Sequence, residues 1–171
     1  MKIIFDKYTD NKKEVWEEIN KNASATFLSS IDWINFQKSL GKEVDQYLIY
    51  ADDIPVGNFY IEIFKRRIAK FAYSPYGPVV AWSRFNPGIN NENTEYRTQT
   101  TDATREKSLK KENPFASSDL LPILLRSIYQ EVIKFQMHYI KEKGLNLFRI
   151  DPLVKKENLV KFLDLGYKRS L

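Results

Sequence analysis

The residue best placed for acid–base or polar chemistry is Asp151, in the stretch Phe148-Arg149-Ile150-Asp151-Pro152. It ends an apolar run typical of a buried strand, and sites in open sheets tend to lie where strands end. A carboxylate there could orient an amine or a hydroxyl, or act as a base if its pKa were raised. The local alternative is that Asp151 caps the Asp-Pro turn. Arg149 could pair with a phosphate or face solvent.

A second group of candidates lies nearer the start of the chain, in a mixed polar and aromatic segment containing Trp33, Gln37 and Lys38. Trp33 and Gln37 are one helical step apart, so both side chains can face the same side of a helix. Lys38 is rotated from Gln37 by about 100° on an ideal helix. Because most such tryptophans are core residues, Trp33 is interpreted either as core or as part of a site.

The middle of the chain combines two tyrosines, two prolines and a glycine in Phe71-Ala72-Tyr73-Ser74-Pro75-Tyr76-Gly77-Pro78-Val79. Each proline favours extended backbone in the residue before it. Two interpretations stay open: a kink that moves the chain between sheet positions, and a cleft wall built from Tyr73 and Tyr76.

A basic turn is predicted at Lys65-Arg66-Arg67 and Lys70, between two strand-like runs. Such a hairpin could contact phosphate, although charges at a strand connection usually form a hydrated turn. His138 lies among apolar neighbours in a long helical segment and is interpreted as a surface or boundary residue.

The elements that position these residues follow from hydrophobic periodicity and turn chemistry. Ser29 or Ser30 is predicted to cap the second helix, and Gly41 to end it. Strands are predicted at 2–6, 44–50, 56–64, 68–73, 145–150 and 167–169, and helices at 12–19, 30–40, 120–143 and 157–165. This order predicts an α/β (α+β) fold with a mixed central sheet flanked by helices, and it matches the chain path of GCN5-related N-acetyltransferase folds.

Length and composition set further limits. A chain of 171 residues with 43% hydrophobic content can bury one core, so we expect a single domain over 1–171 with a flexible polar loop at about 83–117. The sequence has no cysteine and one histidine, which argues against a metal site. No apolar run approaches a membrane span or a signal peptide, which predicts a cytoplasmic protein. The net charge of +5 favours an anionic partner.

The turn in the middle of the chain also bears on cofactors. An acetyltransferase of this fold holds the pyrophosphate of coenzyme A in a glycine-rich turn after its fourth strand, because backbone N–H groups bind the anion there. We assign that place to Tyr73–Pro78, which has one glycine and two prolines without N–H groups. We therefore expect no coenzyme A and no other cofactor.

Three stretches resemble, in order, the FemABX family of peptidoglycan interpeptide-bridge aminoacyltransferases. They are the segment 27–41, the segment 71–79, and the pair formed by 148–152 and Leu165-Gly166-Tyr167. The resemblance covers most of the chain and agrees with the predicted element order.

The resemblance implies transfer of an amino acid from aminoacyl-tRNA to an amine of a muropeptide precursor, either UDP-linked or lipid-linked, without a metal. In that family two acetyltransferase-like domains enclose the site, and the first contributes to the precursor cleft. The resemblance therefore places six residues near such a cleft: Trp33, Gln37, Lys38, Tyr73, Tyr76 and Asp151. It assigns no catalytic base.

Two features differ from the family. Some members carry a lysine for the precursor's phosphate where this sequence has Gln37. The sequence also corresponds to the first domain only, so contact with aminoacyl-tRNA is expected through a second domain. We expect part of an acyltransferase: a fragment, a half-protein that needs a partner, or a member without catalysis. Two alternatives stay open, namely a coenzyme A-dependent N-acyltransferase with a divergent loop and a non-catalytic module that binds nucleic acid.

Overall fold

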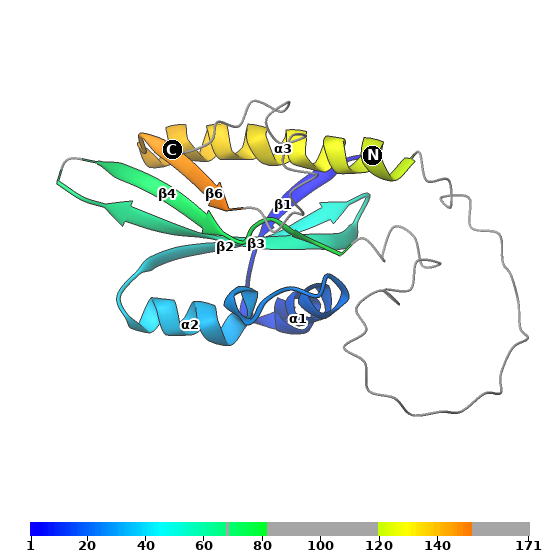
Figure 1. The fold of residues 1–171 in the computed structure, drawn as a ribbon, viewed down its shortest axis with the longest axis horizontal. Coiled ribbons are helices and arrows are strands. Elements are labelled where there is room, and N and C mark those ends of the chain that lie inside the picture. Colours follow the sequence, from blue (N-terminus) through cyan, green and yellow to red (C-terminus); the bar gives the residue numbers. More distant parts are fainter. Residues whose placement is uncertain (68, 82–119, 152–171) are drawn as a thin grey trace, which may run out of the picture.

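The computed structural model describes residues 1–67, 69–81 and 120–151 (Figure 1). The first half contains β1 (Ile3–Lys7), a 3₁₀ turn η1 (Asp10–Lys12), α1 (Lys13–Asn22), a second 3₁₀ turn η2 (Phe27–Ser29) and α2 (Ile31–Ser39). The second half contains β2 (Glu43–Ala51), β3 (Ile54–Lys65), β4 (Lys70–Pro75), β5 (Val79–Val80), α3 (Leu120–Lys143) and β6 (Leu147–Asp151).

These elements agree with the sequence-based prediction for the described residues, with ends that differ by a few positions. The strand β5 and the two 3₁₀ turns, η1 and η2, were not predicted. The predicted polar loop at 83–117, the helix at 157–165 and the strand at 167–169 lie outside the described residues.

The sheet has the order β1-β2-β3-β4-β6, with β5 paired to β3. The pairs from β1 to β4 are antiparallel, whereas β6 joins β4 in parallel. A parallel neighbour needs a crossover connection, and α3 belongs to that connection. Figure 1 shows α3 covering one face of the sheet, while α1 and α2 cover the other. None of the helices in the described part of the chain is long and apolar enough to cross a membrane.

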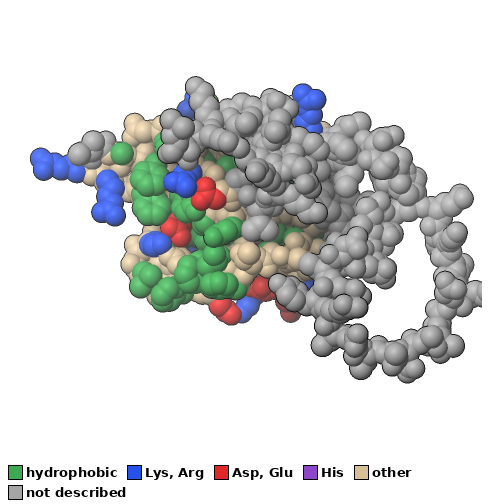
Figure 2. Space-filling view, in the orientation of Figure 1, with side chains coloured by type: hydrophobic (Ala, Val, Ile, Leu, Met, Phe, Trp, Pro, Cys, Tyr) green, Lys and Arg blue, Asp and Glu red, His purple; other side chains and the backbone are tan. Residues whose placement is uncertain are grey.

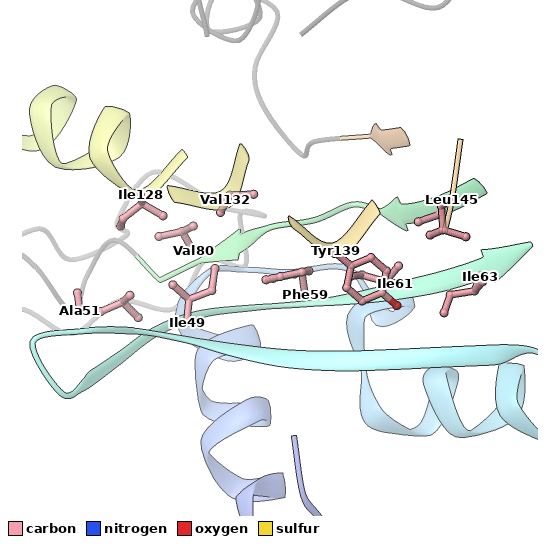
Figure 3. Packing of buried hydrophobic residues seen from close by; sticks show 12 residues of the cluster. Ile49, Ala51, Phe59, Ile61, Ile63, Val80, Ile128, Val132, Tyr139 and Leu145 are labelled. Carbon is pink, nitrogen blue, oxygen red and sulfur yellow. The ribbon is translucent and has the colours of Figure 1, made fainter. Parts of the chain in front are cut away.

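The core on the α3 side consists of alternating residues of β2 and β3, such as Ile49 and Ile61, together with α3 residues such as Val132 (Figure 3). Aromatic rings dominate one part of this core. The Phe5 and Phe135 ring centroids are 4.7 Å apart, and those of Tyr47 and Phe135 are 4.8 Å apart. Fully buried side chains of this layer, such as Ile49 and Ile61, each contribute about 1.5–3 kcal/mol, whereas the rings of Phe5, Tyr47 and Phe135 are partly buried against it.

The core on the other side packs α1 and α2 against the sheet, and a polar bridge crosses it. Trp16, which is fully buried, donates its indole N–H to the Ser29 carbonyl at 2.8 Å. Asn58 of β3 donates to the Trp16 carbonyl at 3.2 Å and to Asn20 Oδ1 at 3.0 Å. Nearby, the Ser30 hydroxyl accepts from the Trp33 N–H, so Ser30 is the cap of α2. These bonds fix α1 to β3 and to the turn η2 that precedes α2.

The segment between Tyr73 and Val79 is a bulge within a strand. Tyr73 pairs with Glu62 and Val79 pairs with Asn58, so four steps along β3 are opposed by six steps along β4 and β5. Tyr76, with φ of +53°, lies in the bulge, and the Gly77–Pro78 peptide bond is cis. The chain is therefore kinked here, but β4 and β5 both pair with β3, so the kink does not move the chain to another sheet position.

This geometry corrects the expected position of a coenzyme A loop. Strand pairing continues to Val80, so residues 74–78 do not connect the strand to the next helix. The connection between β5 and α3 is residues 82–119, which lie outside the described residues. The prolines at positions 75 and 78 are consequently no argument against coenzyme A.

The bulge depends on close packing of Gly77, and this generates a prediction. A Cβ added at Gly77 would lie 2.6 Å from Ser74 Oγ and 3.0 Å from Phe59 Cβ. We expect Gly77→Ala to lower the free energy of unfolding in urea by about 1–3 kcal/mol through overpacking. Ser74→Ala should cost little by itself, because the buried Ser74 hydroxyl has no hydrogen-bond partner among the described residues. The double variant should recover part of the Gly77→Ala loss; equal losses in both would refute this packing account.

A charged cluster joins β1, β2 and the end of α3 around Asp45. Its carboxylate accepts a hydrogen bond from the Tyr139 hydroxyl at 2.8 Å and lies 3.2 Å from Lys7 Nζ and 3.3 Å from Lys143 Nζ. Burial raises the pKa of this carboxyl, but the Tyr139 hydrogen bond and the two lysines outweigh burial and lower the pKa below its ordinary 3.8. A lowered pKa stabilises the fold above that ordinary value, and the stabilisation is lost as pH falls through the folded-state pKa.

We expect Asp45→Asn to lower the free energy of unfolding at pH 7 by about 1.5–3 kcal/mol, the usual value of hydrogen bonds to charged groups. The difference from the wild type should shrink below pH 3.8, as measured by urea unfolding at a series of pH values. Asp53→Asn, at an exposed turn, is the matched control and should change little. A difference that stays constant down to pH 2 would contradict the assignment.

Candidate functional site

The candidate site lies at the last pairs that the structure describes between β4 and β6. These pairs are Ser74 with Ile150 and Pro75 with Asp151. Here the Tyr73 hydroxyl donates to Asp151 Oδ2 at 2.6 Å, which joins two segments far apart in the sequence. The Arg149 guanidinium lies 3.3 Å from Asp151 Oδ1 and 5.5 Å from the centre of the Tyr73 ring. The three side chains form a contiguous cluster, and 40% of the Asp151 side chain remains exposed.

The strand register places this cluster on the face of the sheet that α1 and α2 cover in part. Ile61 and Ala72 belong to the α3-side core, so their neighbours Tyr60 and Tyr73 point to the opposite face. Side chains on that face form ranks across β3, β4 and β6. The ranks are Phe64, Phe71 and Leu147, then Glu62, Tyr73 and Arg149, then Pro75 and Asp151.

Tyr60 connects the cluster to α2. Trp33 lies close enough to the Tyr60 hydroxyl to affect its pKa, and Tyr76 lies close enough to act electrostatically on both Tyr60 and Tyr73. Burial raises the pKa of Tyr60 to about 12, against the lowering effect of Trp33. The Trp33 ring itself packs between Phe27 and Phe36, at 5.4 and 5.5 Å.

The protonation state of Tyr73 follows from its surroundings. Burial first, and then the hydrogen bond and the negative charge of Asp151, raise the pKa of Tyr73 well above its ordinary value of 10.0. Arg149 opposes this shift only in part. Tyr73 is therefore a neutral hydrogen-bond donor at physiological pH, and the carboxylate beside it is the acceptor.

Four of the six residues assigned from the sequence come together in this way: Trp33, Tyr73, Tyr76 and Asp151. Gln37 and Lys38 belong to α2 but lie away from this group. Gln37 is buried, and its Oε1 has no hydrogen-bond partner among the described residues. Lys38 donates to Gln46 Oε1 at 2.5 Å on β2. No contact of the described residues joins either one to Asp151.

The alternative role of Asp151 as a cap concerns backbone N–H groups at 153–155, which are outside the described residues. Within the described part, its carboxylate bonds to the side chains of Tyr73 and Arg149.

Two residues of the site were missed by sequence reasoning. Tyr60 links Trp33 to the tyrosines of the bulge, and Glu62 lies beside Tyr73 and pairs with Lys42 at 3.1 Å. Asn58, Tyr60 and Glu62 are polar residues at alternate positions of a strand. That period of two indicates a polar stripe on one face, and it was the signal available in the sequence.

Other parts of the described chain offer less chemistry. No group of three or more His, Cys, Asp or Glu side chains in residues 1–67, 69–81 and 120–151 could hold a metal ion. A cavity of about 400 Å³ lies between α1 and η2, lined by residues that include Glu17, Lys21 and Thr26. Its lining includes Phe27 and Ser30, which both contact Trp33, and none of the clustered tyrosines.

Comparison with known proteins bears on the fold. No family model matches the sequence, and no curated protein matches it. Solved structures do match over nearly the whole chain. Glucosamine-6-phosphate N-acetyltransferase from Arabidopsis thaliana has a TM-score of 0.53 at 14% identity, covering 100% of this chain and 95% of that one. A probable acetyltransferase has a TM-score of 0.55 at 12% identity, covering 100% and 92%. AAC(6')-Iy, in complex with a bisubstrate analogue, has a TM-score of 0.53 at 12% identity, covering 99% and 92%.

The chain has the GCN5-related N-acetyltransferase fold. The predicted fold class, a mixed sheet flanked by helices, is thereby confirmed. At these identities the likeness concerns the arrangement of the elements, and it says nothing specific about the FemABX family.

The Tyr73–Asp151 pair makes a spectroscopic prediction. Asp151→Asn removes the negative charge that raises the pKa of Tyr73, so this pKa should fall, although burial should keep it above 10.0. Tyrosines labelled with ¹³C at Cζ would report this shift in an NMR titration. The pKa of Tyr60 is not influenced by Asp151 and should stay at about 12 as an internal control. An unchanged Tyr73 titration would contradict the hydrogen bond.

Proposed function

We propose that this chain takes part in acyl transfer to an amine, with the acceptor amine bound beside Tyr73 and Asp151. The observation that carries the proposal is the Tyr73–Asp151 hydrogen bond beside the last described pairs of β4 and β6. The partly exposed carboxylate offers an ammonium group both charge and a hydrogen-bond acceptor. The acetyltransferase fold supports the reaction class.

The side chains of the cluster have complementary proton-transfer roles. Asp151 can accept a proton from the amine as its nitrogen attacks the acyl carbon. Tyr73, which the raised pKa keeps protonated, can donate its proton to the atom that leaves the acyl carbon. Arg149 orients both groups, because it pairs with the carboxylate and lies over the tyrosine ring.

The first candidate donor is coenzyme A, which would supply the acyl group as a thioester. The described residues fit one part of it. β5 has β3 as its only strand neighbour in the described part of the chain, so its other backbone edge could pair with an extended amide chain such as the pantetheine arm. Val79 and Val80 would hold that arm. The structural likenesses favour this donor, which was the alternative in the sequence analysis.

The second candidate donor is aminoacyl-tRNA, with a muropeptide precursor as acceptor, as in the FemABX family. What favours it is the contact between Tyr73 and Asp151, because these residues come from two of the three stretches that resemble the family. With this donor the described residues would contribute the acceptor side of the site.

The two donors can be separated directly. Acetyl-coenzyme A should raise the melting temperature by mass action if it binds the folded chain. Incubation with a panel of primary amines, followed by mass spectrometry, would detect acetylated products. A parallel reaction would use charged tRNA and a UDP-linked muropeptide. Absence of product in both reactions, with no thermal shift, would refute the proposed function.

With the active donor, Asp151→Asn and Tyr73→Phe should each lower kcat/KM by about 10²-fold or more, the usual contribution of a positioned acid or base. Stability should change little, because both replacements keep the shape of the side chain. Asp53→Asn and Tyr8→Phe are matched controls away from the site and should retain normal turnover. Full activity of Asp151→Asn would make Asp151 a structural residue.

A further inference from the structure

The connection between β3 and β4 concentrates positive charge. It carries Lys65, Arg66, Arg67 and Lys70, and a hydrogen bond from the Arg66 N–H to the Ala69 carbonyl at 2.9 Å closes the turn. Lys65 pairs with Glu43 at 2.5 Å. Arg66 and Arg67 are exposed, and no acidic partner for them exists among the described residues. Most of the positive charge of the turn is therefore not neutralised by acidic side chains of the described residues.

An apolar platform adjoins this basic turn. The rings of Phe64 and Phe71 are stacked, with centroids 4.8 Å apart and planes inclined by 8°. Leu147 pairs with Phe71 on β6, and its side chain is 57% exposed. Figure 2 shows hydrophobic side chains beside the protruding Lys and Arg side chains at this end of the molecule. The platform and the cations thus form one surface.

The turn is held in place by the connection between α3 and β6. The Lys70 N–H donates to Asn146 Oδ1 at 3.2 Å, and the Asn146 N–H donates to the Lys70 carbonyl at 2.8 Å. These two bonds fix the base of the hairpin, so the cations are presented from a rigid support. A fixed surface loses less conformational entropy when a ligand binds.

We propose that the basic β3–β4 turn and the adjoining Phe64, Phe71 and Leu147 bind single-stranded RNA. Proteins that bind single strands combine cations that follow the phosphates with aromatic faces on which bases stack, and both occur here side by side. A small phosphate ligand fits less well, because the two arginines lie on an exposed turn and form no cavity with other described residues. An anionic membrane fits less well too, because the rings lie half-buried on a flat sheet face and not at the projecting tip.

The surface is continuous with the candidate site. Leu147 and Asp151 are four positions apart on the same face of β6, which corresponds to about 13 Å at the usual rise of a strand. A strand of RNA bound at the turn would therefore reach Tyr73 by following the ranks of the sheet. The binding itself does not depend on the acyl donor.

The test uses a fluorescein-labelled oligouridylate of about twelve nucleotides, with anisotropy measured from about 50 to 200 mM salt. Arg66→Ala/Arg67→Ala should weaken binding at least tenfold at low salt and reduce the salt slope by about 1.4, because two phosphates of the single strand are then no longer neutralised. Lys13→Ala/Lys21→Ala, on α1, removes the same charge elsewhere and is the matched control. Phe71→Leu should weaken binding several-fold while the salt slope stays the same, because it removes a stacking face but no charge.

Equal effects of the two double variants would overturn the proposal, since binding would then reflect net charge alone. Binding of vesicles that contain phosphatidylserine, lost in Arg66→Ala/Arg67→Ala without an effect on RNA, would also overturn it. The assay contains no acyl donor, so its outcome is separate from that of the acyl-transfer test. Arg66→Ala/Arg67→Ala should acetylate a small amine at the wild-type rate if coenzyme A is the donor.

Discussion

The parallel pairing of β6 with β4 is the constraint on which the rest of the structure depends. A parallel neighbour cannot be reached by a hairpin, so the chain must cross one face of the sheet, and α3 lies on that face. The pairing also brings Asp151 beside Tyr73, although they are 78 positions apart. The bulge follows Tyr73, and β5 beyond it pairs with β3 again. The site exists because the parallel pairing brings Tyr73 and Asp151 together.

The sequence predicted the local elements well, since their signals are local. Ser30 is the cap of α2, and the apolar period of the segment 120–143 corresponds to α3. The bulge was harder to interpret, because prolines and a glycine indicate a break without indicating which strand pairs on either side. The prediction that Tyr73–Pro78 occupies the place of the coenzyme A loop was wrong for this reason. Pairing is a long-range property, and only the register with Asn58 and Gly57 reveals it.

The candidate site was predictable in part. Asp151 was selected because it sits at a strand end and Tyr73 as part of a possible cleft wall, and the fold brings them into contact. Gln37 was selected from its helical spacing to Trp33, and Lys38 from the family resemblance. Neither signal shows what lies beneath the helix. In the structure Gln37 is buried over the sheet and Lys38 bonds to Gln46. Tyr60 was overlooked because a tyrosine in a strand ordinarily indicates packing.

The buried amide of Asn58 has a consequence for folding fidelity. Its two hydrogen bonds, to the Trp16 carbonyl and to Asn20, exist only while β3 presents this side chain to α1. A slip of β3 by one position would turn the amide into the apolar layer beneath α3, where the core residues offer it no polar partner. Misaligned sheets would then carry an unpaired buried amide, and the apolar side chains of β3 would turn away from the layer beneath α3 as well. Asn58 therefore favours the observed register of β3, mainly because it destabilises other registers.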